Sequence, residues 1–100
     1  MIRDYRQQGD FSIACPLPLK PLTGSISLAG CGYERRADPG YDWHGRRRGD
    51  SLCVLLQWTI SGRGHLVYEG RDYTVEKGQA LMVHFPHEHR YFWTSGDPPW

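Results

Sequence analysis

The sequence has no long apolar run, no strong net charge and few cysteines. No stretch approaches the roughly 18 consecutive apolar residues that indicate a membrane-spanning helix, and the first residues lack the basic and apolar regions of a secretory signal peptide. A formal net charge of +1 gives no field that would attract nucleic acid. Cys15, Cys31 and Cys53 are widely scattered and form no CxxC pair. We therefore expect a reduced, cytoplasmic protein with no membrane partner.

The sequence also lacks helical periodicity. No window of about 11–18 residues places its apolar side chains on one face of a helix. A helix-turn-helix unit or a coiled-coil seam is therefore not expected within these 100 residues. Aromatic residues, in contrast, are abundant, with four Trp and six Tyr, which suits a pocket that stacks on a ligand.

Short apolar segments alternate with turn residues, and this spacing predicts one small all-β domain. Turn signals recur at intervals of roughly 8–12 residues, as in a small sandwich or barrel. A weaker strand is predicted at residues 25–36, with a bulge near its glycines, and a short one at residues 41–43. The main predicted strands are residues 52–60, 65–69, 71–75, 80–85 and 89–94.

The most apolar of these strands, residues 52–60, has two different faces. One face is predicted to be core and consists of Leu52, Val54, Leu56, Trp58 and Ile60. The other is mixed and consists of Cys53, Leu55, Gln57 and Thr59. The mixed face suits either the inside of a small barrel that holds a polar ligand or a surface exposed to solvent.

Residues 1–22 have no clean period and are predicted to be an extended N-terminal arm. Pro16, Pro18 and Pro21 forbid a helix and favour an extended chain. One hypothesis is a lid that lies across the barrel; the alternative is a terminus without fixed structure.

Four motifs resemble the sensory N-terminal domain of AraC-type transcription regulators. They are Trp58-Thr59-Ile60-Ser61-Gly62-Arg63-Gly64, then Tyr68-Glu69-Gly70-Arg71-Asp72-Tyr73-Thr74-Val75, then Lys77-Gly78-Gln79-Ala80-Leu81-Met82-Val83, and His89-Arg90-Tyr91. The resemblance implies a cupin-like double-stranded β-barrel over residues 23–100, incomplete at its C-terminus. It also implies an arm that closes over a bound effector, a homodimer, and a C-terminal DNA-binding domain that is absent from these residues.

The resemblance further implies a pocket inside the barrel for a sugar or other small metabolite. It assigns Arg47 and Tyr91 to this pocket. The residues expected to supply directional hydrogen bonds are Arg47, Gln57, Thr59 and His89, and the aromatic walls would be Tyr91, Trp93 and Trp58. The alternative for Trp58 is a plain core role, because it shares a face with four aliphatic residues.

Two other functional hypotheses are kept. Cupins often bind a metal, and His87 and His89, two residues apart on an extended segment, would point to one side as in a Zn²⁺ or Ni²⁺ site; a small metal-dependent cupin enzyme is therefore the alternative function. An interaction protein that presents a free sheet edge is the third. No nucleophile motif is present, so we expect a binding protein without cofactor or metal and not an enzyme.

Overall fold

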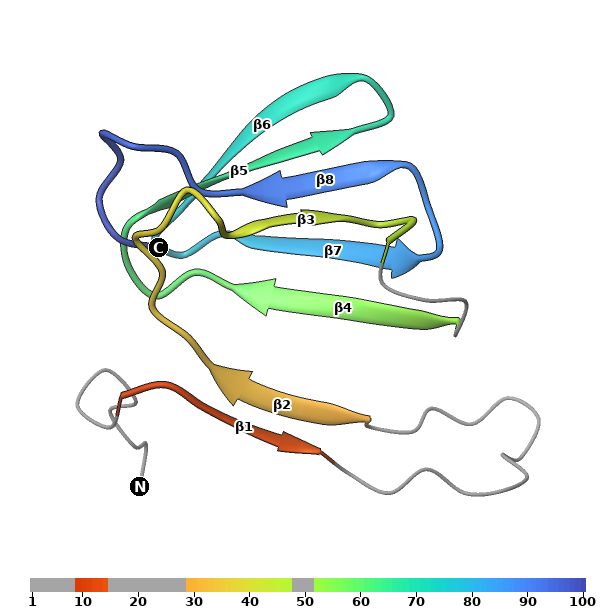
Figure 1. Cartoon of the computed structure of the whole chain (residues 1–100), viewed down its shortest axis with the longest axis horizontal. Helices are drawn as coiled ribbons and strands as arrows, with labels where there is room; N and C mark the ends of the chain where they lie inside the picture. Colours follow the sequence, from red (N-terminus) through yellow and green to blue (C-terminus); the bar gives the residue numbers. More distant parts are fainter. Residues whose placement is uncertain (1–8, 15–28, 48–51) are drawn as a thin grey trace. The chain divides into compact units, whose positions relative to one another are not determined.

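The structure is a computed structural model that describes residues 9–14, 29–47 and 52–100. The described residues form eight strands and no helix, which confirms the all-β class (Figure 1). The strands are β1 (Phe11–Ala14), β2 (Gly30–Tyr33), β3 (Asp42–His44), β4 (Cys53–Trp58), β5 (Arg63–Tyr68), β6 (Arg71–Glu76), β7 (Ala80–Phe85) and β8 (His89–Phe92). The chain divides into two compact units, Met1–Arg35 and Arg36–Trp100.

The first unit contains one antiparallel strand pair. Strand β1 pairs with β2 in a register that sets Phe11 opposite Tyr33, and the amide of Arg35 donates to Asp10 Oδ1 at 3.0 Å. Strand β1 lies inside the predicted arm, but most of that arm, residues 1–8 and 15–22, falls outside the described residues. The weak strand predicted at residues 25–36 is the shorter β2.

The second unit contains two antiparallel sheets. The larger has the strand order β3-β8-β5-β6, and the smaller pairs β4 with β7. The strands are as short as the turn spacing predicts, but among the described strands of this unit β5 and β6 are the one consecutive pair that forms a hairpin. The hydrogen-bonded ladders of the described strands do not close into a barrel.

The turn between β5 and β6 shows how the local sequence sets the register. Tyr68 and Arg71 are paired, so the loop has only Glu69 and Gly70. Both have positive φ, 49° and 78°, as a type I′ hairpin turn requires. The right-handed twist of the two strands is thereby continued through the predicted turn.

The core of the second unit lies between its two sheets. Alternate residues of β7, Leu81, Val83 and Phe85, are at most 3% exposed, and they belong to one cluster with Val75 of β6 and Tyr91 of β8. Because side chains of a strand alternate between its faces, every second residue of β7 places its side chain in the core.

The core face predicted for residues 52–60 is wrong. Leu52, Val54, Leu56 and Trp58 are 88%, 67%, 68% and 63% exposed. Instead, Leu55 of β4 packs against the core cluster, and the β4–β7 register sets Leu55 opposite Val83 and Gln57 opposite Leu81. Paired residues lie on the same side of a sheet, so the mixed face of β4 turns inward and its apolar face turns outward.

Trp100 completes the core at the ends of β4 and β5. Its side chain is 8% exposed, and its indole N–H donates to Thr59 Oγ1 at 3.0 Å. Its backbone N–H donates to the carbonyl of Arg36 at 2.7 Å. The ring lies against Gly64, where a side chain would overlap it.

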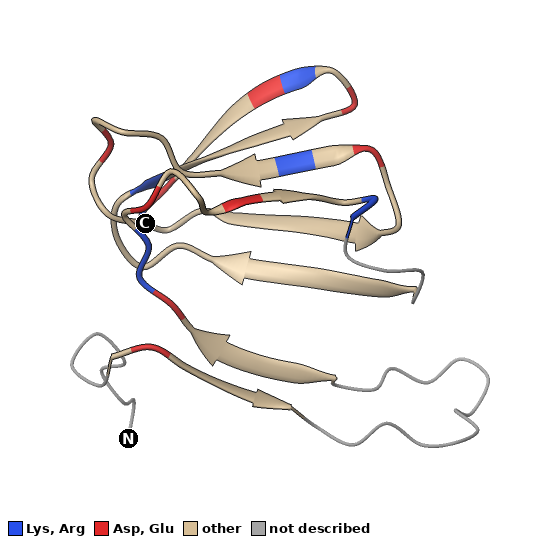
Figure 2. Cartoon of the chain, viewed as in Figure 1, with Lys and Arg blue, Asp and Glu red and all other residues tan. Residues whose placement is uncertain are grey.

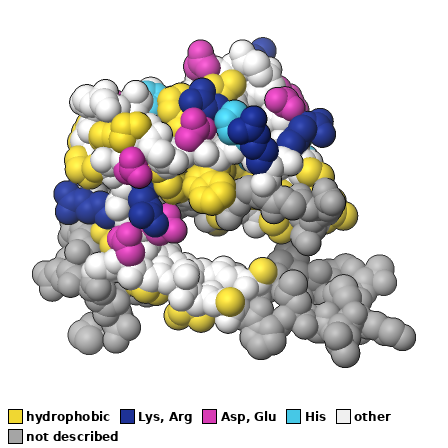
Figure 3. Space-filling model, in the orientation of Figure 1, with side chains coloured by type: hydrophobic (Ala, Val, Ile, Leu, Met, Phe, Trp, Pro, Cys, Tyr) yellow, Lys and Arg dark blue, Asp and Glu magenta, His cyan; other side chains and the backbone are white. Residues whose placement is uncertain are grey.

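The outer face of the four-stranded sheet carries ion pairs, and side chains of both signs lie close together there (Figure 3). Arg90 donates to both carboxylate oxygens of Asp42, at 2.8 and 2.7 Å. Asp97 accepts from His65 and from Arg63. The pKa of Asp97 is lowered from 3.8, first by the hydrogen bond from His65.

Replacing Gly64 by Ala would place a methyl group in the indole ring of Trp100. We expect the free energy of unfolding to fall by about 1–3 kcal/mol, the range for overpacked cores. Gly40→Ala is the matched control, because its added Cβ would meet nothing nearer than the Asp38 carboxylate, at 3.1 Å; it should cost less than about 0.5 kcal/mol. Urea denaturation measures both. Equal effects of the two variants would contradict the packing of Trp100 on Gly64.

The lowered pKa of Asp97 predicts sensitivity to acid. Because its pKa is lower in the folded than in the unfolded chain, the contribution to stability is present above the unfolded value and is lost as the pH falls through the folded one. Wild-type stability should therefore decline below about pH 4. In Asp97→Asn the part of the decline that Asp97 causes should be absent. The variant Asp72→Asn, at an exposed residue, should decline as the wild type does. Urea midpoints measured across this pH range test the difference.

Candidate functional site

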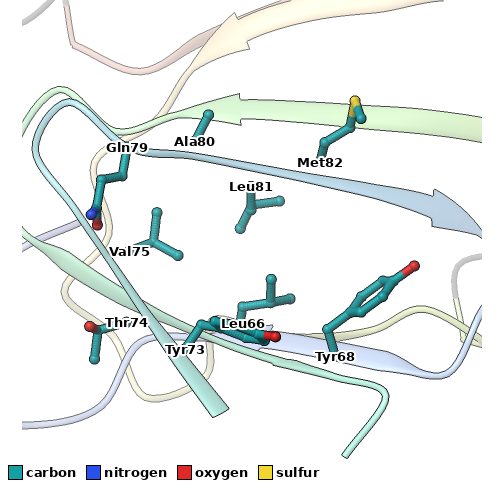
Figure 4. Close-up of a pocket in the computed structure, with 9 residues that line it drawn as sticks. All are labelled: Leu66, Tyr68, Tyr73, Thr74, Val75, Gln79, Ala80, Leu81 and Met82. Atoms are coloured by element: carbon teal, nitrogen blue, oxygen red, sulfur yellow. The ribbon is translucent and has the colours of Figure 1, made fainter. Parts of the chain in front are cut away.

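An open pocket of about 540 Å³ lies in the second unit where β6 and β7 diverge (Figure 4). These two strands are consecutive in the chain but belong to different sheets, so they share no ladder that would close the space between them. The pocket is lined by Leu66, Tyr68, Tyr73, Thr74, Val75, Gln79, Ala80, Leu81 and Met82.

The lining combines an apolar base with aromatic walls and a polar border. Leu66, Val75 and Leu81 extend toward one another in Figure 4, and Val75 and Leu81 are buried. Tyr68 and Tyr73 supply the aromatic surface. The lining contains no charged residue and no histidine, so it suits an uncharged guest: a charged one would lose hydration without gaining an ion pair.

Hydrogen bonds at the β6–β7 turn hold one end of the pocket. The amide of Gly78 donates to the carbonyl of Thr59 at 2.9 Å, and the amide of Thr59 donates to the carbonyl of Gln79 at 2.8 Å. Gln79 Oε1 also accepts from the amide of Glu76 at 2.9 Å, which orients its side-chain amide. The turn is therefore fastened to the end of β4, while the strands separate beyond it.

None of the six predicted ligand residues is part of this lining. Arg47 is exposed after β3, and its backbone amide donates to the carbonyl of His44 at 3.0 Å. Thr59 is 2% exposed and its hydroxyl accepts from Trp100. Trp93 is 8% exposed, and its indole N–H donates to the carbonyl of Pro98 at 3.1 Å.

The other three predicted residues lie one strand away from the lining. Gln57 of β4 is paired with Leu81. Tyr91 and His89 of β8 are paired with Leu66 and Tyr68, respectively. Tyr91 is only 1% exposed and His89 is 4% exposed, so both side chains are buried in the core, on the same face of the sheet as Leu66 and Tyr68.

Tyr68 and Tyr73 were not among the predicted ligand residues, although a local signal was present. The register of the β5–β6 hairpin pairs Tyr73 with Leu66, the neighbour of Tyr68 on the same face. A two-residue hairpin at Glu69-Gly70 therefore places both tyrosines on one face. The sequence did not indicate that β7 would join a different sheet from β6 and leave a space beside these tyrosines.

The histidines form a stacked cluster. The rings of His87 and His89 lie 5.7 Å apart at 22°, so they face the same way as the metal hypothesis requires, and His84 lies 4.4 Å from His87. Glu69 Oε1 is 3.4 Å from His87 Nε2. Across residues 9–14, 29–47 and 52–100, however, no group of three or more His, Cys, Asp or Glu residues is arranged to hold a metal ion.

Comparisons with protein-family models, curated proteins and solved structures found no match to this chain. Within the described residues, no helix is long and apolar enough to cross a bilayer.

Tyr91 offers a direct test of core against ligand roles. Because it is buried among Val75, Leu81 and Val83, Tyr91→Ala should lower the free energy of unfolding by about 3–5 kcal/mol, as for other buried aromatic residues. Tyr73→Ala, at a side chain 47% exposed, should cost much less. Chemical denaturation compares the two. A Tyr91→Ala protein of nearly wild-type stability would contradict the core role.

Proposed function

We propose that this chain is a small-molecule-binding module, the cupin-like effector-sensing domain of an AraC-type transcription regulator. The observation that carries the proposal is the uncharged, partly aromatic pocket between β6 and β7. Concave sites with mostly apolar walls and a few polar groups are the usual binding sites for small ligands. The four collinear motifs that resemble the AraC-type sensory domain supply the family.

The two facing antiparallel sheets support the cupin-like part of the proposal. The resemblance implies a pocket inside the barrel, and here the lining comes from β5, β6, β7 and Gln79 just before β7. The motifs of the resemblance at residues 68–75 and 77–83 include most of that lining.

The chemistry of the lining narrows the ligand to an uncharged metabolite with one flat or apolar face, a description that includes a sugar ring. Tyr68 or Tyr73 would stack on that face, which contributes about 0.5–1.5 kcal/mol beyond burial if it resembles an aromatic pair. Thr74 and Gln79 would form hydrogen bonds with hydroxyl groups of the ligand. Gln57, Tyr91 and His89 would support the site from the neighbouring strands.

The proposed mechanism is linkage between ligand binding and sheet position. A ligand in the pocket contacts β6 of one sheet and β7 of the other. It would therefore stabilise the conformation in which the distance between these two strands fits the ligand. The difference in binding free energy between the two conformations would also shift the conformational equilibrium of an attached domain. Binding to DNA would require that separate domain.

A ligand screen by thermal and chemical denaturation tests this function. We expect a stabilising compound among neutral sugars and neutral aromatic metabolites, and none among small organic acids. A ligand at about 100 times its dissociation constant adds about 2.7 kcal/mol to the free energy of unfolding. A flat response across the whole panel would contradict the function.

Tyr73→Ala locates the site. This variant should remain folded and should lose most of the stabilisation by the compound, because it removes one aromatic wall. Tyr33→Ala makes the same change in the first unit, outside the pocket lining, and should keep the full response. Equal responses of the two variants would place the ligand elsewhere.

A further inference from the structure

The pocket of the second unit is lined by consecutive residues of two strands, and this pattern places strand edges along its wall. Residues 73–75 of β6 and residues 80–82 of β7 all belong to the lining. Successive side chains of a strand point to opposite faces, so the side chains of one face would supply only every second residue. Backbone groups at the edges of β6 and β7 therefore form part of the lining.

The register of the β5–β6 hairpin shows which backbone groups of β6 face the pocket. Tyr68 and Arg71 flank the two-residue turn and form a hydrogen-bonded pair, as in hairpins of this type. Hydrogen-bonded and non-hydrogen-bonded pairs alternate along an antiparallel ladder, so the pair of Thr74 with His65 is not hydrogen-bonded. The N–H and C=O groups of Thr74 therefore point away from β5, toward the edge at which β6 has no partner among the described strands.

The edge of β7 on the other side of the pocket is open as well. The carbonyl of Gln79 accepts from the amide of Thr59 at 2.8 Å and so points toward β4, and by alternation the backbone groups of Leu81 do the same. The N–H and C=O groups of Ala80 and Met82 therefore point away from β4, the one strand that pairs with β7 among those described. In Figure 4 the side chains of Ala80 and Met82 point away from Leu81, so these two residues offer the pocket their backbone.

At the closed end of the pocket, the edge of β6 already binds an amide-like group. Gln79 donates its backbone N–H to the carbonyl of Glu76, and its Oε1 accepts from the amide of Glu76, both at 2.9 Å. Glu76 lies two residues beyond Thr74, so its backbone groups have the same direction. One donor and one acceptor of Gln79 thus satisfy both backbone groups of a β6 residue, as a neighbouring strand would.

The two edges carry no charge along the pocket. Figure 2 shows no charged residue along β7, and the charged residues of β6 lie outside residues 73–75. A ligand between the strands therefore meets neutral backbone donors and acceptors on two sides. Each of these groups that the ligand covers needs a new hydrogen-bond partner, because a buried donor or acceptor without one is costly.

We propose that the ligand of this pocket is a flat, neutral cyclic amide whose adjacent N–H and C=O groups pair with the backbone of Thr74. This inference rests on the small-molecule-binding function proposed above and names the class of ligand. Cyclic dipeptides satisfy both edges, because their ring has one amide on each of two opposite sides. One amide pairs with Thr74 and the other with Ala80 or Met82, while Tyr73 covers the ring.

Calorimetric titration with two matched compounds tests the ligand class. The probes are the cyclic dipeptide of glycine and phenylalanine and its N,N′-dimethyl derivative, which keeps the ring and both carbonyls but has no N–H donor. The parent compound should bind, and the methylated one should bind about tenfold more weakly or less, since it leaves backbone acceptors of the edges unpaired. Equal affinities, or binding of neutral sugars but of no cyclic amide, would overturn the ligand class and leave the binding function standing. A flat response to amides and sugars alike would overturn both.

Proline at position 74 tests the backbone contact itself. Thr74→Pro removes an N–H that takes no part in the β5–β6 ladder, a place where an edge strand tolerates proline, and affinity for the cyclic dipeptide should fall about tenfold or more. Thr74→Ala keeps this N–H, and Asp72→Pro removes the next N–H of the same edge, outside the lining; both should bind like wild type. Circular dichroism checks folding, and the methylated compound decides if Thr74→Pro unfolds. Equal binding by the two proline variants would overturn the pairing with Thr74.

Discussion

The structure of the second unit depends on the burial of one face of β7. Leu81, Val83 and Phe85 pack against the inner face of the four-stranded sheet, where Val75 and Tyr91 are their neighbours in the core. Full burial of such side chains contributes about 1.5–3 kcal/mol each, a large share of the stability expected for so small a domain. Strand β4 pairs with β7 through their ladder, and its Leu55 packs against this core. The orientation of β7 therefore decides which face of β4 turns toward the core.

Two features with different consequences arise from this one constraint. On the inner side, β7 leaves β6 after the tight turn at Gly78, and the space between them is a pocket with tyrosines beside it. On the outer side, the same strand presents Met82 beside Leu56 of β4, and this surface has no charge. The two features meet at Met82, which lines the pocket and is 69% exposed.

Much of the local structure could be predicted from the sequence. The glycine turns and the short apolar segments between them predicted most of the strands that the structure shows, and residues 80–85 match β7 at both ends. The candidate site was harder to predict. Tyr91 was predicted from the family resemblance and His89 as a hydrogen-bonding group, yet both are buried in the core beside the lining rather than in it. Thr59 was expected to meet a ligand, but its hydroxyl accepts from Trp100, a contact between residues 41 positions apart that no local pattern contains.

The sequence by itself determined the all-β class and the tight turn at Glu69-Gly70 that joins β5 and β6, because these depend on backbone preferences and on residues close together in the chain. Only the tertiary structure decided which face of β4 is buried. Hydrophobicity alone favoured the face of Val54, Leu56 and Trp58, which is exposed, and the register with β7 turns the mixed face inward. The pocket also depends on the tertiary structure, because it forms only where two consecutive strands, β6 and β7, join different sheets.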